Sequence, residues 1–326
     1  MAGHSRAGLA AAIACIGLLA ACSGPKTASP GSPSTTDPAS TPVAPSARPT
    51  QSAATLDGLV VLADGVQGGI GLWTYGQSGW ASTQPIPHAS AIASASGGIA
   101  VANGQTVETR AGSDLGKVTS TVTLQWPGSA PTNGVVAFSL ASGGRLALVA
   151  DEDNVSYATA GADGEVGDVA PAASQPFTPL IAWLDTERVV VMSTDARQVS
   201  RVAVGRSPQD FSDLPGLIGC RWFAVSGDGG SIAAGTDSGV YVAAAQTWLS
   251  GGTPGKIANL EPGVVVWAMA LDRSGSRLAY LAGSVSADGT VTSAHEIVYS
   301  SGSGSWQQVA DLTVPFSKAL GQAWAG

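Results

Sequence analysis

The chain has 326 residues with 43 glycines, a net charge of −8 and a charged fraction of only 12%. Soluble domains usually carry about a quarter charged residues, so this composition favours closely packed sheets joined by tight turns. The negative net charge, with the few basic residues scattered singly, argues against a nucleic-acid partner because phosphates require a basic surface.

Residues Met1–Ala21 are predicted to be a secretion signal. A short polar start containing Arg6 precedes an apolar run from Leu9 to Ala20, too short to span a bilayer of about 30 Å comfortably. The run leads into Leu-Ala-Ala-Cys at 19–22, which resembles the bacterial lipobox. This resemblance implies that Cys22 is the lipid attachment site and the first mature residue, anchored by acyl chains such as palmitate. An ordinary secretory peptide or an uncleaved apolar tail is the alternative.

Residues 22–54 are predicted to be a disordered linker, because Pro, Ser, Thr and Ala dominate this segment. It lacks the apolar bulk to form a core, and its prolines favour extended conformations. We expect the linker to hold the following domain away from the membrane surface. The sequence leaves open whether its Ser and Thr residues carry O-glycans.

Residues 55–326 are predicted to be an all-β domain, because short β-rich runs alternate with Gly, Ser and Asp turns and no convincing amphipathic helix is visible. A strand–turn–strand unit recurs along this region and is clearest at Val264–Gly283. The first apolar residue of its second strand returns roughly every 40–47 residues, the period of four-stranded propeller blades. Six such residues predict six blades: Leu59, Ile99, Leu146, Val189, Ile232 and Leu278.

The first strand of each unit is predicted to be the innermost strand of a blade, since it is rich in small and apolar residues. Gly, Asp and Ser follow at 142–144, 227–230 and 273–276, where glycine permits the positive φ of a tight hairpin. The unit at Val189 departs from this pattern with Asp-Thr-Glu at 185–187. Most inner strands carry one aromatic residue: Phe138, Trp183, Trp222 and Trp267.

The C-terminal segment Ala319–Gly326 resembles an inner strand, with Trp324 as its aromatic residue. At the other end, Leu56–Ala63 contains a second strand with no inner strand before it. The C-terminal strand is therefore predicted to fill the missing inner position of the first blade. This pairing would close the ring and leave no open gap between the first and last blades.

The sequences Ser-Gly-Gly-Arg-Leu-Ala at 142–147 and Ser-Gly-Ser-Arg-Leu-Ala at 274–279 resemble TolB-type and WD40-like propeller repeats. Together with the lipobox, they resemble actinobacterial lipoproteins that carry a propeller. The resemblance covers 55–326 and implies a six-bladed β-propeller. Propellers host binding, scaffolding and several hydrolytic chemistries, so the resemblance specifies the fold far more than the function.

Candidate catalytic groups are few. The points just before the inner strands, where channel ligands of propellers usually lie, carry His88, Asn133, Arg221 and Glu261. This mixed set is poor for a metal site, and no catalytic residue, metal or cofactor is predicted. His295 is expected at the surface of an outer strand, and the acidic run 151–154 in a solvated turn. Cys220, the one cysteine in the predicted propeller domain, is expected to be a buried small hydrophobe.

The predicted function is a lipid-anchored binding or scaffolding module at the extracytoplasmic face of the cell membrane. Its expected partners are the membrane, through the anchor, and a protein or envelope component. Two alternatives stay open: a propeller hydrolase, lactonase-like or glycan-cleaving, with its active site in the channel, and an accessory or sensor subunit of an envelope complex.

Overall fold

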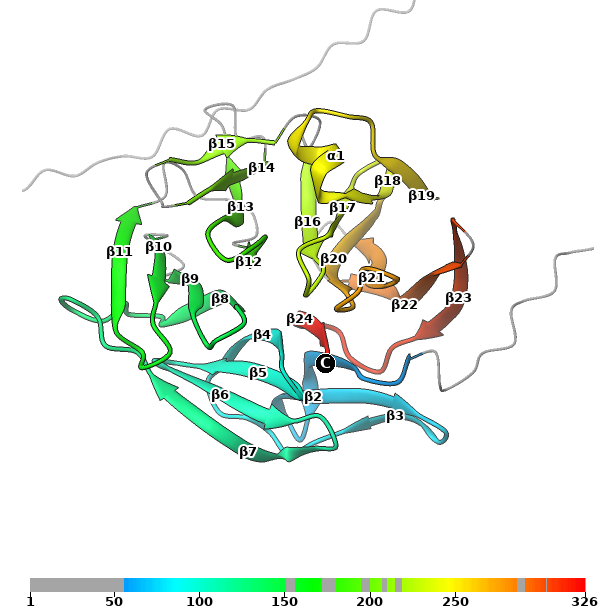
Figure 1. Cartoon of the computed structure of the whole chain (residues 1–326). Coiled ribbons are helices and arrows are strands. Elements are labelled where there is room, and N and C mark those ends of the chain that lie inside the picture. The colour runs from blue at the N-terminus through cyan, green and yellow to red at the C-terminus, as the bar shows by residue number, and fades with distance from the viewer. Residues whose placement is uncertain are drawn as a thin grey trace, which may run out of the picture. The chain divides into compact units, whose positions relative to one another are not determined.

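A computed structural model describes residues 56–150, 156–171, 180–194, 200–206, 210–214, 219–285, 291–302 and 304–325. These residues form six four-stranded antiparallel sheets arranged as a ring of blades (Figure 1). The prediction of an all-β, six-bladed propeller is confirmed. The predicted signal segment, Cys22 and the linker lie outside the described residues, as does the acidic run 151–154.

The strands of each blade are named in their order from the axis outward, beginning with the first three blades. Blade 1 contains β24 (Ala319–Trp324), β1 (Leu59–Val66), β2 (Gly69–Gly76) and β3 (Gly79–Ser82). Blade 2 contains β4 (Ala89–Ala95), β5 (Gly98–Asn103), β6 (Thr106–Ala111) and β7 (Asp114–Thr123). Blade 3 contains β8 (Val135–Leu140), β9 (Leu146–Ala150), β10 (Ser156–Ala160) and β11 (Val166–Pro171).

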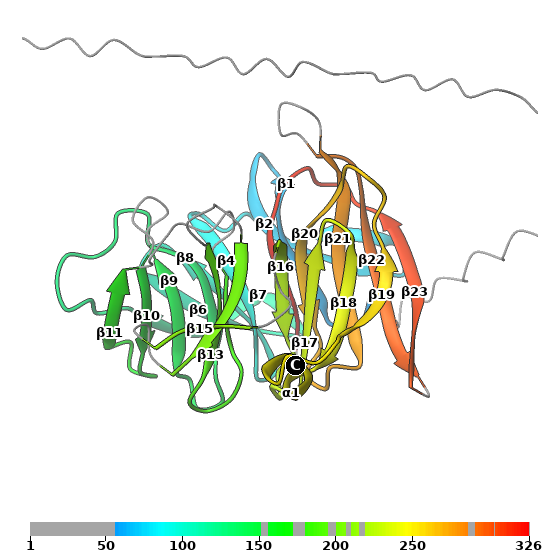
Figure 2. The ribbon, with the colours of Figure 1, turned by 90° about the horizontal axis from the view of Figure 1, so that it is seen from above.

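The other three blades follow in chain order. Blade 4 contains β12 (Ile181–Trp183), β13 (Val189–Thr194), β14 (Ser200–Gly205) and β15 (Ser212–Asp213). Blade 5 contains β16 (Cys220–Val225), β17 (Ser231–Thr236), β18 (Gly239–Ala244) and β19 (Gly255–Asn259). Blade 6 contains β20 (Val264–Leu271), β21 (Arg277–Val285), β22 (Val291–Gly302) and β23 (Ser305–Thr313). Seen at 90° to the first view, the strands of blade 5 run side by side through the depth of the ring (Figure 2).

The second strand of each blade forms the core. Every residue of β9 is buried, and the first five residues of both β1 and β5 are buried as well. These strands are covered on both faces by neighbouring blades, which is why they read as continuous apolar runs rather than as alternating patterns. The six residues that the sequence analysis used to count blades lie in β1, β5, β9, β13, β17 and β21, one in each blade.

One element of the described chain departs from the expectation of a domain without helices. The short helix α1 (Ala245–Leu249) follows β18 and buries Trp248, whose indole Nε1 donates a hydrogen bond to Ile232 O at 3.0 Å. Five residues are too few to generate a detectable helical period, so this helix depends on tertiary packing. Within the described residues, no helix has the length and apolar content needed to cross a membrane.

The turn between β20 and β21 is held by the carboxylate of Asp272. Its Oδ1 accepts hydrogen bonds from the backbone N–H groups of Ser276 at 2.8 Å and Arg277 at 3.0 Å. Its Oδ2 accepts from Arg277 Nε at 3.2 Å. Burial by itself would raise the pKa of Asp272, but the hydrogen bonds from Arg277 and Ser276 outweigh burial and lower it. The Asp-Thr-Glu turn of blade 4 uses similar chemistry, because Asp185 Oδ1 accepts from the N–H groups of Glu187 and Arg188.

The ring closes as the sequence predicted. Strand β24 pairs antiparallel with β1, and Leu59 lies opposite Trp324. The closing strand also bonds to blade 6, because Trp324 Nε1 donates to Ala270 O at 3.2 Å. The guanidinium of Arg277 lies 4.2 Å from the centre of the Trp324 ring. Closure therefore joins the two ends of the domain and also its first and last blades.

Replacing Trp324 by Ala tests this closure. Trp324 is 2% exposed, and truncating a buried Trp typically costs about 3–5 kcal/mol. We expect a loss of that size in the free energy of unfolding, measured by urea denaturation followed by circular dichroism. Trp306→Ala is the matched control, since Trp306 is partly exposed on the outermost strand of blade 6. Equal losses in the two variants would contradict a special role for the closing strand.

Replacing Asp272 by Asn tests the turn. At neutral pH the variant should lose about 1–3 kcal/mol, because hydrogen bonds to an ionised acceptor are lost. A lowered folded-state pKa gives stability that is present above the ordinary value of 3.8 and is lost as pH falls toward the folded value. The difference between wild type and variant should therefore shrink in acid, as chemical denaturation at pH 7 and pH 3 would reveal. Asp237→Asn, at an exposed ion pair with Arg221, should change stability little at either pH. A pH-independent difference for Asp272→Asn would contradict this account.

Candidate functional site

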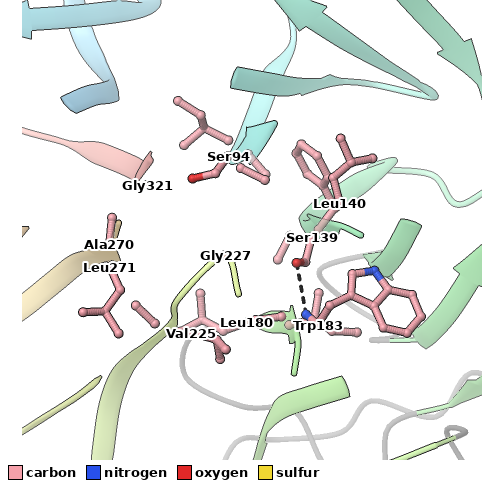
Figure 3. A pocket seen from close by; sticks show the side chains of 18 of the residues that line it. Ser94, Ser139, Leu140, Leu180, Trp183, Val225, Gly227, Ala270, Leu271 and Gly321 are labelled. Carbon is pink, nitrogen blue, oxygen red and sulfur yellow. Dashed lines mark hydrogen bonds between the residues drawn. The ribbon is translucent and has the colours of Figure 1, made fainter. Parts of the chain in front are cut away.

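A cavity of about 930 Å³ lies on the propeller axis. The inner strands of all six blades line it, and side chains from several blades converge on it in Figure 3. Each inner strand pairs with its own blade on one side only. Its other edge therefore directs backbone N–H and C=O groups toward the axis, where those not bonded to a neighbouring blade are available to a ligand.

The cavity wall combines small or apolar side chains with serine hydroxyls. Ser139 on β8 accepts a hydrogen bond from the backbone N–H of Trp183 on β12 at 3.1 Å, which joins blades 3 and 4 (Figure 3). Ser90 on β4 donates to Val135 O and joins blades 2 and 3 in the same way. Ser94, near the end of β4, is exposed and points into the cavity (Figure 3). Two of these hydroxyls thus fix blade contacts, while Ser94 faces the open space.

Charged side chains enter the lining at the ends of the inner strands. Asp185, Asp228 and Arg273 lie on turns that follow inner strands, and Lys318 precedes β24. Neighbouring turns are bonded together, since the N–H of Asp228 donates to Arg273 O at 3.0 Å. Gly229, with a φ of 72°, passes so close to Leu184 O that an added Cβ would lie 1.7 Å from it. Glycine is required there by this approach between blades 4 and 5.

A β-bulge is a shared feature of the inner strands that the sequence analysis did not find. In five of the described inner strands, one extra residue stands where the register shifts; these residues are Ser90, Val136, Arg221, Trp267 and Leu320. Three of them, Ser90, Val136 and Leu320, line the cavity. Bulges redirect side chains and often lie beside binding sites. They were not recognisable in the sequence because apolar residues on both faces of these strands hide the two-residue alternation.

The structure does not gather the channel-mouth positions that the sequence singled out. His88, Asn133, Arg221 and Glu261 are all exposed, and none of them lines the cavity. Arg221 instead pairs with Asp237 at 3.0 Å. Across the described part of the chain, no three His, Cys, Asp or Glu side chains are grouped closely enough to hold a metal ion.

Two other sequence expectations concern Cys220 and His295. Cys220 is fully buried, as expected, and burial raises the pKa of its thiol to about 12, so it is inert as a nucleophile at neutral pH. His295 is partly exposed on β22, and its Nδ1 lies 2.6 Å from Asp311 Oδ1. Neither residue touches the cavity.

Glu296 on β22 and Gln322 on β24 are a buried polar pair that was not predicted from the sequence. Glu296 is 0% exposed and Gln322 is 6% exposed, although both are polar. Gln322 also contributes to the cavity lining. A signal was present in the sequence: His295 and Glu296 are consecutive in a strand, so their side chains point to opposite faces and one of them must point inward.

The cavity is suited to binding. Its volume falls within the range of about 300–1,000 Å³ that ligand pockets span, and such pockets combine apolar walls with a few placed polar groups. Hydroxyls, strand edges and the charges at the strand ends are the polar groups that this cavity offers.

The comparisons with known proteins show a similarity of fold. No protein-family model matches the chain, and no curated protein matches it. Among solved structures, a putative TolB from Agrobacterium tumefaciens is similar, with a TM-score of 0.54, 11% identity, and coverage of 81% of this chain and 91% of that one. A periplasmic gluconolactonase from Pseudomonas aeruginosa gives a TM-score of 0.50 and 16% identity, covering 80% of this chain and 84% of that one. At these identities the likeness is one of fold: this six-bladed propeller has TolB-like and gluconolactonase-like structural neighbours.

Proposed function

We propose that this chain is a lipid-anchored binding module that takes a protein or envelope component at the extracytoplasmic face of the cell membrane. The observation that carries the binding role is the axial cavity of about 930 Å³. Its wall presents strand edges, hydroxyls and apolar side chains from six blades, a combination that can hold a ligand through many weak contacts. The rigid ring holds these groups in place before the ligand arrives, which reduces the ordering cost of binding.

The proposed location rests on the N-terminal sequence. The apolar run from Leu9 to Ala20 followed by Leu-Ala-Ala-Cys at 19–22 supports export and acylation of Cys22. Two or more acyl chains make the anchor stable, since each buried CH₂ contributes about 0.8 kcal/mol. The proline-rich residues 22–54 then supply a semi-extended spacer between the membrane and the propeller.

A channel-filling variant tests the binding role. Ser94→Trp places a large side chain in the cavity, and Ser96→Trp is the matched control, because Ser96 is exposed in the following turn and does not line the cavity. Wild-type chain carrying an affinity tag is used to capture components of a detergent-solubilised envelope extract, which are identified by mass spectrometry. We expect capture to fall at least about tenfold with Ser94→Trp, a loss of about 1.4 kcal/mol, and to persist with Ser96→Trp.

Two results would contradict this proposal. Equal capture by both variants would show that the cavity is not the binding site. Lactone or glycan hydrolysis by the purified chain, lost in Ser94→Trp and kept in Ser96→Trp, would instead favour the hydrolase alternative, since the same fold carries a gluconolactonase in P. aeruginosa. A captured partner that is itself an integral membrane protein would favour a role as an accessory or sensor subunit.

The anchor is tested by Cys22→Ala. The variant cannot form the thioether to lipid, so we expect it to leave the membrane fraction or to accumulate as an uncleaved precursor. Fractionation and intact-mass analysis of the expressed chain measure both outcomes. Cys220→Ala is the control, because Cys220 lies buried in blade 5. Unchanged mass and membrane partitioning in Cys22→Ala would contradict acylation at this residue.

A further inference from the structure

Glu296 occupies a position that does not suit an ionised carboxylate. It lies in β22 with 0% exposure, and neither Oε1 nor Oε2 has a hydrogen-bond partner among the described residues. Its cross-strand neighbours are Leu281 and Leu312, both members of apolar clusters shared with blade 1. An isolated charge in such a place would be strongly unfavourable, so a buried carboxyl there is normally paired or neutral.

Gln322 is the polar group that meets Glu296 from the closing strand. Its Nε2 donates to Ala279 O on β21 at 2.7 Å, while its Oε1 is buried and has no donor in the described structure. The Gln322 amide lies near enough to the Glu296 carboxyl to oppose the rise in its pKa, although no pair of their atoms meets hydrogen-bond geometry. An ionised carboxylate has only acceptors and cannot satisfy Gln322 Oε1, whereas a protonated carboxyl carries one O–H donor. A single proton on Glu296 thus removes the buried charge and supplies the missing hydrogen bond.

The surrounding charged and titratable groups have other roles. On the strands packed against Glu296 these groups are Arg277 and Tyr280 on β21, His295 and Tyr299 on β22, Asp311 on β23 and Asp64 on β1; β24 carries none. Arg277 binds Asp272 and stacks on Trp324. Asp64 accepts from Ser317 and from the N–H of Lys318.

The remaining groups lie at strand positions adjacent to the positions whose side chains share a face with Glu296. Their side chains therefore point to the opposite face of the sheet. His295 precedes Glu296 on β22 and pairs with Asp311. Tyr280 lies opposite Ile297, and Tyr280 and Tyr299 stack with ring centres 6.1 Å apart. In the described structure, therefore, none of these groups gives Glu296 a cationic partner.

We propose that Glu296 is a neutral carboxylic acid in the folded protein, that its O–H donates to Gln322 Oε1, and that this hydrogen bond makes closure of the ring sensitive to pH. The bond joins the third strand of the last blade to the strand that completes the first blade. Because Gln322 also lines the axial cavity, loss of the proton would disturb the ring seam and one wall of the cavity together.

The direction of the pH dependence follows from burial. Burial raises the pKa of Glu296 well above the ordinary value of 4.5, and the Gln322 amide offsets this only in part. The folded state therefore holds a proton that the unfolded state has released. Stability from this group is fully present below about pH 4.5 and declines as pH rises toward the folded-state value.

The test compares the full-length wild-type chain, purified in mild detergent, with Glu296→Gln. The glutamine amide can donate to Gln322 Oε1 at every pH, so the variant keeps the hydrogen bond without a titrating proton. We expect similar melting temperatures at about pH 4.5, and above it a growing lag of wild type behind the variant of about 2–4 °C for each pH unit. Glu261→Gln, at an exposed carboxyl, should melt like wild type throughout. A constant difference between wild type and Glu296→Gln across this range would overturn the proposal.

A second measurement does not depend on a variant folding. Carbon-13 labelling of glutamate carboxyls in the wild-type chain distinguishes the protonated from the ionised form by chemical shift, and the infrared carbonyl band of a protonated carboxyl in the same chain serves as an independent check. We expect one carboxyl to remain protonated at pH 7. If all glutamate carboxyls are ionised at pH 7 in the folded chain, the proposal fails and a bound cation or water would have to satisfy Glu296.

Discussion

Pairing of β24 with β1 is the constraint on which the rest of this structure depends. Five blades take all four strands from one continuous segment, whereas blade 1 takes its inner strand from the opposite end of the domain. Without β24, the buried strand β1 would expose a free edge at the axis, and blade 6 would lose the hydrogen bonds that Trp324 and Gln322 donate to it. A ring of blades lacks an open gap only when it is complete, so the whole domain depends on the pairing of β24 with β1.

The closing contacts are chemically diverse. They include backbone pairing of two strands, an indole donor on Trp324, the Arg277 guanidinium over the same ring, and the buried pair of Glu296 and Gln322. Arg277 also donates to Asp57 O, just before the first strand. The seam also contains apolar clusters of the kind found between other neighbouring blades. Polar contacts require defined geometry, so they select one register of β24 where apolar packing alone would tolerate slippage.

The architecture could be predicted from the sequence because its strongest signals are local. The continuous apolar second strands recur at a blade-like spacing, and an unmatched strand at each end points to closure. The site was harder to predict, because no local pattern specifies which residues of an inner strand reach the axis. The bulges at Ser90, Val136 and Leu320 shift the alternation of side chains between the two faces of their strands. Such a shift cannot be recognised in the sequence of a strand that is apolar on both faces. The burial of Glu296 was not predicted, because it depends on packing against a closing strand that follows later in the sequence.

Closure by the last strand also has a consequence in time. Synthesis runs from the N-terminus, so the outer edge of β1 can pair with β2 before its inner edge can pair with residues 319–324. Every other blade can complete its own sheet as soon as its segment is made, but the ring as a whole cannot be sealed until almost the entire domain exists. Until residues 319–324 are made, the inner edge of the apolar strand β1 has no partner strand, and a chain that lacks these residues leaves that edge unpaired. Pairing of β24 with β1 thus requires that the whole domain has been made.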